Sequence, residues 1–262
     1  MAHQLQHKSS FGSDKITRPI KFIVVCVFVF VAGLSVTIYF YYSMTGDMKM
    51  PGGWNMSMMW MRMQGQTWFA SAVSFLLMWL AMMVAMMMPS VLPMFLKTRR
   101  RSASLCCMAS GYFAIWLIAG LGIYALGMMY GIFTMQSELL SRAVPLLSGA
   151  SLIAAGAIQF TRWKMIRLLR CRSTSGCAIS YSGNETSFGI GCKQGLACCA
   201  CCATLMAIQL VLGIMNLFVM VMTALVIAAE KLLPRPEITT RFIGIAAMFA
   251  GIIIVINWAM TN

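Results

Sequence analysis

The chain alternates long apolar runs with shorter polar segments, which is the pattern of a helical membrane protein. Several runs reach 18 residues or more without a charge, the length at which an apolar helix crosses a bilayer. We predict an all-α fold: a polytopic transmembrane helical bundle with about seven spans. The predicted spans are residues 22–42, 68–96, 105–129, 143–160, 196–212, 217–233 and 242–258.

The number of spans depends on residues 195–233, an apolar stretch that is too long for one crossing. A single helix over these residues would be about 58 Å long, whereas the hydrocarbon core of a bilayer is about 30 Å thick. Gly213 and Asn216 offer a turn within it, because glycine and asparagine tolerate turn conformations. We therefore divide the stretch into two spans. Six spans, with one long or bent helix, is the alternative.

The distribution of charge predicts the orientation. The 262-residue chain is 60% hydrophobic and only 10% charged, yet it carries a net charge of +14. Its basic residues gather in residues 1–21, 97–101 and 161–194, beside apolar spans, which is the positive-inside pattern and not that of a nucleic-acid-binding surface. The pattern predicts a multi-pass protein of the cell inner (cytoplasmic) membrane, surrounded by lipid, with a cytoplasmic N-terminus and no nucleic-acid partner.

The predicted domain organisation follows from the spans and the charges. Residues 1–21 form a cytoplasmic N-terminal tail, and residues 22–262 form a single helical membrane domain. Within that domain we expect a methionine-rich outer loop at 43–67 and a basic cytoplasmic loop at 161–194.

Cysteine chemistry is the most distinctive feature of the predicted membrane interior. Four cysteines occupy five positions of span 196–212: Cys198, Cys199, Cys201 and Cys202. At 100° per residue, Cys198, Cys201 and Cys202 share about 100° of arc, Met206 lies on the same ridge, and Cys199 lies beyond its edge. Cuprous copper accepts two or three soft ligands, so this face predicts a copper site. The alternative is that these cysteines pack as small apolar residues.

Methionine is the second soft ligand in excess, with 27 residues in the chain. Eight of them lie between positions 44 and 63, and span 68–96 carries a further stripe at helical spacing. From that stripe we select four candidate metal ligands: Met82, Met83, Met86 and Met87. A thioether binds cuprous copper without titrating. The alternative is that methionine fills the core as a flexible apolar residue.

Together these residues resemble a bacterial family of predicted metal-binding integral membrane proteins, some of which are described as copper chaperones. The resemblance covers about residues 68–256. It is carried by the segments 82–89, 159–173, 191–206 and 213–231, which include Gln159, Lys164, Cys171 and the Glu230-Lys231 pair. Membership implies a helical membrane protein that handles copper.

The chain also departs from that family's pattern. Arg167 stands where the family usually has a second cysteine in the basic loop, and Gln194 stands where it has a histidine. Ala200 and Ala203 replace its usual glycine and tryptophan. These differences weaken the expectation of a metal site in the basic loop and retain the one in span 196–212.

Three functions are compatible with the sequence. The leading hypothesis is a membrane copper-handling protein that binds, relays or delivers cuprous ion through Met and Cys ligands to a cuproenzyme or a membrane complex. The second is a membrane thiol oxidoreductase, which adjacent cysteines favour, although no outer cysteine pair is available to receive substrate thiols. The third is a non-catalytic accessory or assembly subunit. We favour a protein that is not an enzyme.

Overall fold

The computed structural model describes residues 2–43, 47–49, 55–57, 67–97, 102–177, 186–213, 216–233 and 236–261. Within these ranges the chain forms eight helices and two short strands. In chain order they are α1 (Ala2–Ser43), β1 (Asp47–Lys49), β2 (Asn55–Ser57), α2 (Trp68–Lys97), α3 (Ser102–Gln136), α4 (Glu138–Gln159), α5 (Arg162–Cys177), α6 (Ser187–Gly213), α7 (Leu217–Leu232) and α8 (Pro236–Thr261). The predicted helical bundle is confirmed.

The two strands lie within the predicted methionine-rich outer loop. β1 and β2 pair antiparallel, with Met48 opposite Met56. Strands of three residues are too short to give a period-two signal in the sequence, which is why the sequence did not predict them. The proposed role of the loop methionines stays a prediction, because the side chains of residues 44–66 lie outside the described part of the structure.

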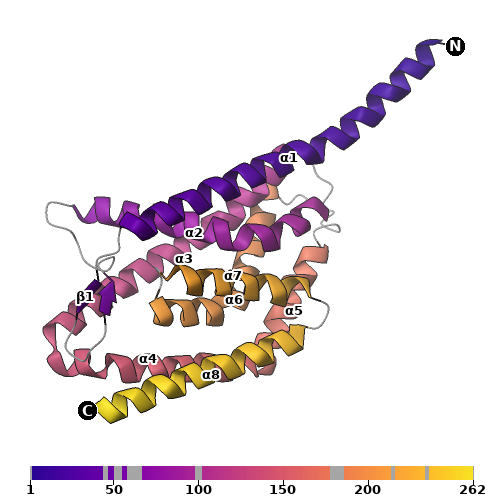
Figure 1. Ribbon diagram of the computed structural model, residues 1–262. Coiled ribbons are helices and arrows are strands. Elements are labelled where there is room, and N and C mark those ends of the chain that lie inside the picture. Colours follow the sequence, from indigo (N-terminus) through magenta and orange to yellow (C-terminus); the bar gives the residue numbers. More distant parts are fainter. Residues whose placement is uncertain are drawn as a thin grey trace.

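Helix α2 is a central helix of the bundle. It packs against α1, α3 and α7, and its span is the most buried of the candidate spans. In Figure 1, α1 runs along one edge of the molecule, α4 and α8 lie side by side along the opposite edge, and α6 and α7 lie between them. The interior of the bundle is therefore built around α2, α6 and α7.

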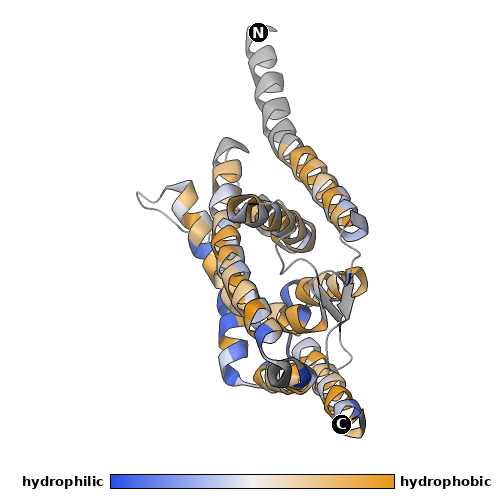
Figure 2. Cartoon of the chain, turned by 90° about the vertical axis from the view of Figure 1, so that its left-hand side faces the viewer, coloured by the Kyte–Doolittle hydropathy of each residue, from blue (hydrophilic) through white to orange (hydrophobic). Residues whose placement is uncertain are grey.

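Six of the helices in the described part of the chain are long and apolar enough to cross a membrane. They comprise Phe22–Ser43, Trp68–Pro93, Ser104–Gln136, Arg142–Gln159, Ser187–Gly213 and Pro236–Met260. Figure 2 shows that apolar residues predominate along most of the coloured helices. Large apolar side chains such as Phe28 and Phe249 are exposed, and they suit contact with lipid. Helix α7 coincides with the predicted span 217–233 but has only 16 residues. The choice between six and seven spans stays a prediction.

The predicted break between α6 and α7 is present. Gly213 ends α6 with a φ of +113°, a conformation that side chains disfavour. Asn216 then caps α7, because its side-chain oxygen accepts hydrogen bonds from the backbone N–H groups of Phe218 and Val219. The chain thus reverses direction at the position that the sequence indicated.

Much of the predicted basic loop 161–194 is helical. Helix α5 buries Lys164, Leu168 and Cys171, which follow one another at spacings of four and three and therefore share one face. Helix α6 also begins earlier than the predicted span, at Ser187. The sequence suggested a loop because α5 is rich in arginine, yet its buried stripe faces the bundle.

Helices α3 and α6 approach closely at three glycines. A Cβ atom at Gly191 would overlap the backbone carbonyl of Met108, one at Gly111 would overlap that of Phe188, and one at Gly195 would lie 2.8 Å from that of Tyr112. Small residues allow membrane helices to pack backbone to backbone. Gly111 is thus used for a helix contact within the chain.

Replacing Gly191 by alanine is expected to destabilise the protein by about 1–3 kcal/mol, because the methyl group meets backbone that cannot rotate away. Thermal unfolding followed by circular dichroism in detergent measures this. Gly122→Ala is the matched control, since nothing lies within 4 Å of a Cβ atom at that position. Equal effects of the two substitutions would contradict the close approach of α3 and α6.

Candidate metal centre

Helix α6 turns three thiols toward the interior of the bundle. Cys198, Cys201 and Cys202 are each only 1% exposed. The Sγ atom of Cys202 lies 3.9 Å from that of Cys198 and 3.6 Å from that of Cys201. The predicted grouping of these three cysteines on one helix face is therefore present, and their sulfur atoms are in mutual contact.

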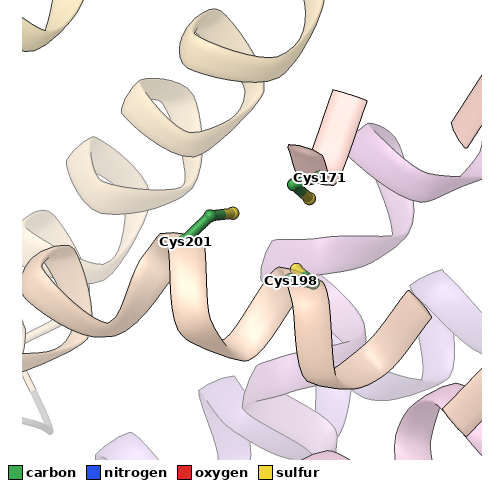
Figure 3. Close-up of side chains that lie close together, drawn as sticks. All are labelled: Cys171, Cys198 and Cys201. Atoms are coloured by element: carbon green, nitrogen blue, oxygen red, sulfur yellow. The ribbon is translucent and has the colours of Figure 1, made fainter. Parts of the chain in front are cut away.

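A fourth thiol reaches this cluster from another helix. Cys171 of α5 is 3% exposed. The Sγ atoms of Cys171, Cys198 and Cys201 all lie within 4.8 Å of one another. Figure 3 shows the three side chains converging from two helices. We call Cys171, Cys198, Cys201 and Cys202 the thiol cluster. A group of thiols this compact can hold a soft metal ion.

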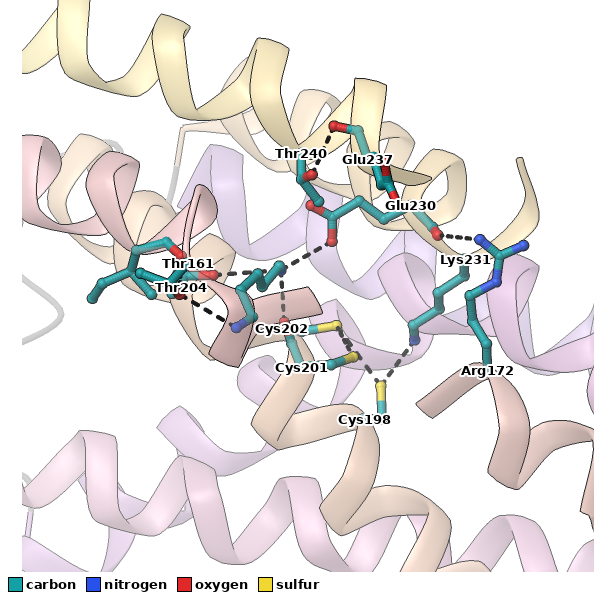
Figure 4. Close-up of polar contacts among 12 residues, drawn as sticks. Thr161, Arg172, Cys198, Cys201, Cys202, Thr204, Glu230, Lys231, Glu237 and Thr240 are labelled. Carbon is teal, nitrogen blue, oxygen red and sulfur yellow. Dashed lines mark hydrogen bonds and ion pairs between the residues drawn. The ribbon is translucent and has the colours of Figure 1, made fainter. Parts of the chain in front are cut away.

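A partly buried cation faces the thiol cluster. The ammonium group of Lys231 on α7 donates a hydrogen bond to Cys198 Sγ at 2.9 Å, as Figure 4 shows. The hydroxyl group of Tyr112 on α3 donates to the same sulfur, also at 2.9 Å. Two donors on one sulfur suit a thiolate, whose negative charge the ammonium group balances.

The fourth thiol is held in its protonated form. The hydrogen bond with Cys198, together with burial, raises the pKa of the Cys171 thiol to about 12. Cys171 must therefore lose a proton when it binds a metal, because the thiolate is the ligand.

Comparison with protein families indicates which metal ion such a site would hold. The family model PpoB2, described as a copper chaperone, matches residues 76–254. The chain belongs to the PpoB2 copper chaperone family. Curated proteins and solved structures gave no match. The match reaches from α2 into α8, so it includes every residue of the thiol cluster.

The predicted methionine ligands of this PpoB2 family member lie in the same buried core as the thiol cluster. Met82, Met83, Met86 and Met87 of α2 are all buried, as is Met206 of α6. The Sδ atom of Met87 lies 3.9 Å from Lys231 Nζ, which links this methionine to the thiol cluster. Farther along α2, the Sδ atom of Met82 accepts a hydrogen bond from the amide nitrogen of Gln209 at 3.5 Å.

Cys199 is placed differently from its neighbours. It is half-buried, packs at the border of the core and is absent from the compact group of three thiols. Its position beyond the edge of the cysteine arc was expected from the helical spacing. Its role as a metal ligand stays a prediction.

A buried ion pair lies next to the thiol cluster and contacts the backbone of Cys201. Lys164 of α5 forms a salt bridge with Glu230 of α7 at 3.0 Å, and both side chains are almost completely buried. The same ammonium group donates to the backbone carbonyl of Cys201 at 2.8 Å. Arg172 donates to the backbone carbonyl of Glu230 at 3.4 Å. Helices α5, α6 and α7 are thus fastened together next to the sulfur atoms (Figure 4).

The sequence did not place Cys171 or Lys231 in the site. Cys171 was assigned to a loop on the strength of its arginine-rich surroundings. Its spacing from Lys164 and Leu168 was the available signal, since the three residues form one helical stripe. For Lys231 the signal was weaker, because a lysine near the end of an apolar span usually extends to the membrane surface.

Proposed function

We propose that this chain binds cuprous ion at the thiol cluster inside a membrane and delivers it to a cuproenzyme or a membrane complex. The observation that carries the proposal is the convergence of Cys171, Cys198 and Cys201 from two helices, with their sulfur atoms within 4.8 Å of one another. Family membership supports copper as the ion. We place the protein in the inner membrane, with its N-terminus in the cytoplasm.

The chemistry of the donors favours a monovalent soft ion. Thiolates and thioethers select cuprous copper, which is satisfied by two or three of them. Two thiolates and one cuprous ion carry one negative charge, and the ammonium group of Lys231 neutralises it. A neutral assembly is the least costly to bury in hydrocarbon, because an uncompensated charge has a large desolvation penalty.

The methionines supply a route to the thiol cluster. Met82 and Met87 lie five residues apart on α2, a rise of about 7.5 Å along the helix axis. Met206 extends the cysteine ridge of α6 by one turn. We propose that the ion moves between thioether sites on these two helices and the thiol cluster. Thioethers exchange the ion without releasing protons, so a proton is lost only at the step in which a thiol of the cluster binds the ion.

The test is the metal content of protein purified in detergent from cells grown with added copper. The wild-type protein is expected to contain copper, and the double variant Cys198→Ser/Cys201→Ser is expected to lose it. Cys106→Ser/Cys107→Ser is the matched control, because these adjacent cysteines of α3 are both exposed. A copper-free wild-type protein that is correctly folded would refute the proposal.

The contact between Cys201 and Cys202, at 3.6 Å, also suits a thiol oxidoreductase. The two functions differ in the oxidation state of the thiols in living cells. A copper chaperone is expected to keep its cluster reduced, so that alkylation under acid quench labels every cysteine. Mixed disulfides that accumulate in the same experiment would favour the oxidoreductase.

A further inference from the structure

A second concave site lies between α5 and α6. It is a groove of about 530 Å³, lined on α5 by residues 163, 166, 167 and 170 and on α6 by residues 193, 196, 197 and 200. On each helix these positions follow the spacings of three and four that define a single face. The lining of α6 faces away from Cys198 and Cys202, which lie roughly on the opposite side of the helix. The groove is therefore separate from the thiol cluster.

One end of the groove is basic. Arg167 and Arg170 of α5 and Lys193 of α6 contribute three cationic side chains, and no acidic side chain is among the lining residues. The guanidinium group of Arg167 lies 3.9 Å from the centroid of the Trp163 ring, which orients it. An arginine held over an aromatic ring, together with a lysine on the other helix of the groove, is suited to a phosphate group, which accepts several charge-assisted hydrogen bonds.

The other end of the groove is apolar. Leu196, Ala197 and Ala200 continue the line of Lys193 toward the middle of α6. Leu196 is largely exposed, whereas the side chains of Ala197 and Ala200 are short; we call the part of the groove lined by these two alanines the furrow. A ligand that fits both ends has an anionic head and an extended hydrocarbon tail. Basic pockets at the ends of membrane helices recognise anionic lipid head groups in this way.

We propose that this groove binds an anionic phospholipid. Its phosphate lies between Arg167 and Lys193, and one acyl chain follows the furrow over Ala197 and Ala200. The lipid then joins α5 to α6 on the side away from the sulfur atoms. Because Arg170 directly precedes Cys171, a bound head group also fixes the end of α5 that carries the fourth thiol.

Native mass spectrometry of the delipidated protein in detergent tests this without reference to copper. Phosphatidylglycerol is titrated in parallel with phosphatidylcholine of the same acyl chains. The wild-type protein is expected to prefer phosphatidylglycerol. The Arg167→Gln/Lys193→Gln variant is expected to bind it about thirtyfold more weakly, since each basic residue near an anionic lipid contributes about a fivefold gain in affinity.

Two further variants make the result specific. Arg162→Gln/Arg241→Gln removes the same charge from exposed positions outside the groove and is expected to bind phosphatidylglycerol as the wild type does. Ala200→Leu fills the furrow without altering charge and is expected to weaken binding. It also tests the groove if the charge variant fails to fold.

Three outcomes would overturn the proposal. They are equal affinity for the two lipids, equal losses in the groove variant and the Arg162/Arg241 control, and displacement of the lipid by millimolar inorganic phosphate. The last result would assign the basic end to small anions.

Discussion

Replacing Lys164 by methionine is expected to lower the free energy of unfolding by about 3–5 kcal/mol. Lys164 and Glu230 form an ion pair whose side chains are 1% and 2% exposed. Breaking a buried pair from one side leaves the other charge without compensation, and this is the costly part of the change. The second carboxylate oxygen of Glu230 has no hydrogen-bond partner among the described residues, so the loss of Lys164 leaves the carboxylate without any hydrogen bond there.

Unfolding of the protein in mixed micelles, followed by circular dichroism, measures this effect. The double variant Lys164→Met/Glu230→Met is expected to recover most of the loss, because it removes both charges and fills the space with apolar side chains. Arg241→Met, at an exposed position of α8, is expected to change stability by less than about 0.5 kcal/mol. A double variant as unstable as the single one would show that the charges are not the reason.

Replacing Cys171 by serine is expected to weaken cuprous binding by at least about a hundredfold. Removing a residue that only supports a metal ligand typically costs ten- to a hundredfold in affinity, and removing a ligand costs more. A hydroxyl group is nearly isosteric with a thiol but is a poor ligand for a soft ion. Cys171 contributes the only sulfur of α5 to the compact thiol group, so its loss also disconnects α5 from the metal.

Competition with a chromogenic cuprous chelator under anaerobic conditions measures this affinity. Cys199→Ser is the matched control: it lies on α6 between the cluster cysteines, yet it is half-buried and outside the compact group. It is expected to bind within a few-fold of the wild type. If Cys199→Ser weakens binding and Cys171→Ser does not, the ion is held by α6 alone and not between two helices.

The contrast between Cys171 and Cys199 shows which parts of the site could be predicted from the sequence. Helical spacing was sufficient to place Cys198, Cys201 and Cys202 on one inward face and Cys199 at its edge, because that arrangement depends on a single helix. Apolar length located the long helices, and Gly213 marked the turn, for the same local reason.

The remainder of the site depends on how helices are packed. Cys171 and Lys231 reach Cys198 across 27 and 33 positions of the sequence, respectively, and no local pattern encodes such contacts. The arginines of α5 made its residues look like a solvated loop, although Lys164, Leu168 and Cys171 are buried. Glu230 precedes Lys231 in the sequence, yet its ion-pair partner is Lys164 of a different helix.

The shortness of α7 has a consequence for the surrounding lipid. Sixteen residues rise about 24 Å, which is less than the roughly 30 Å of hydrocarbon in a typical bilayer. In the seven-span arrangement, in which α7 crosses the membrane, the two leaflets would draw together around it, because mismatch is relieved by local thinning. In that arrangement Lys231, in the last turn of this helix, would lie closer to water than in a thicker bilayer, and an ion released from the thiol cluster would have a shorter way out.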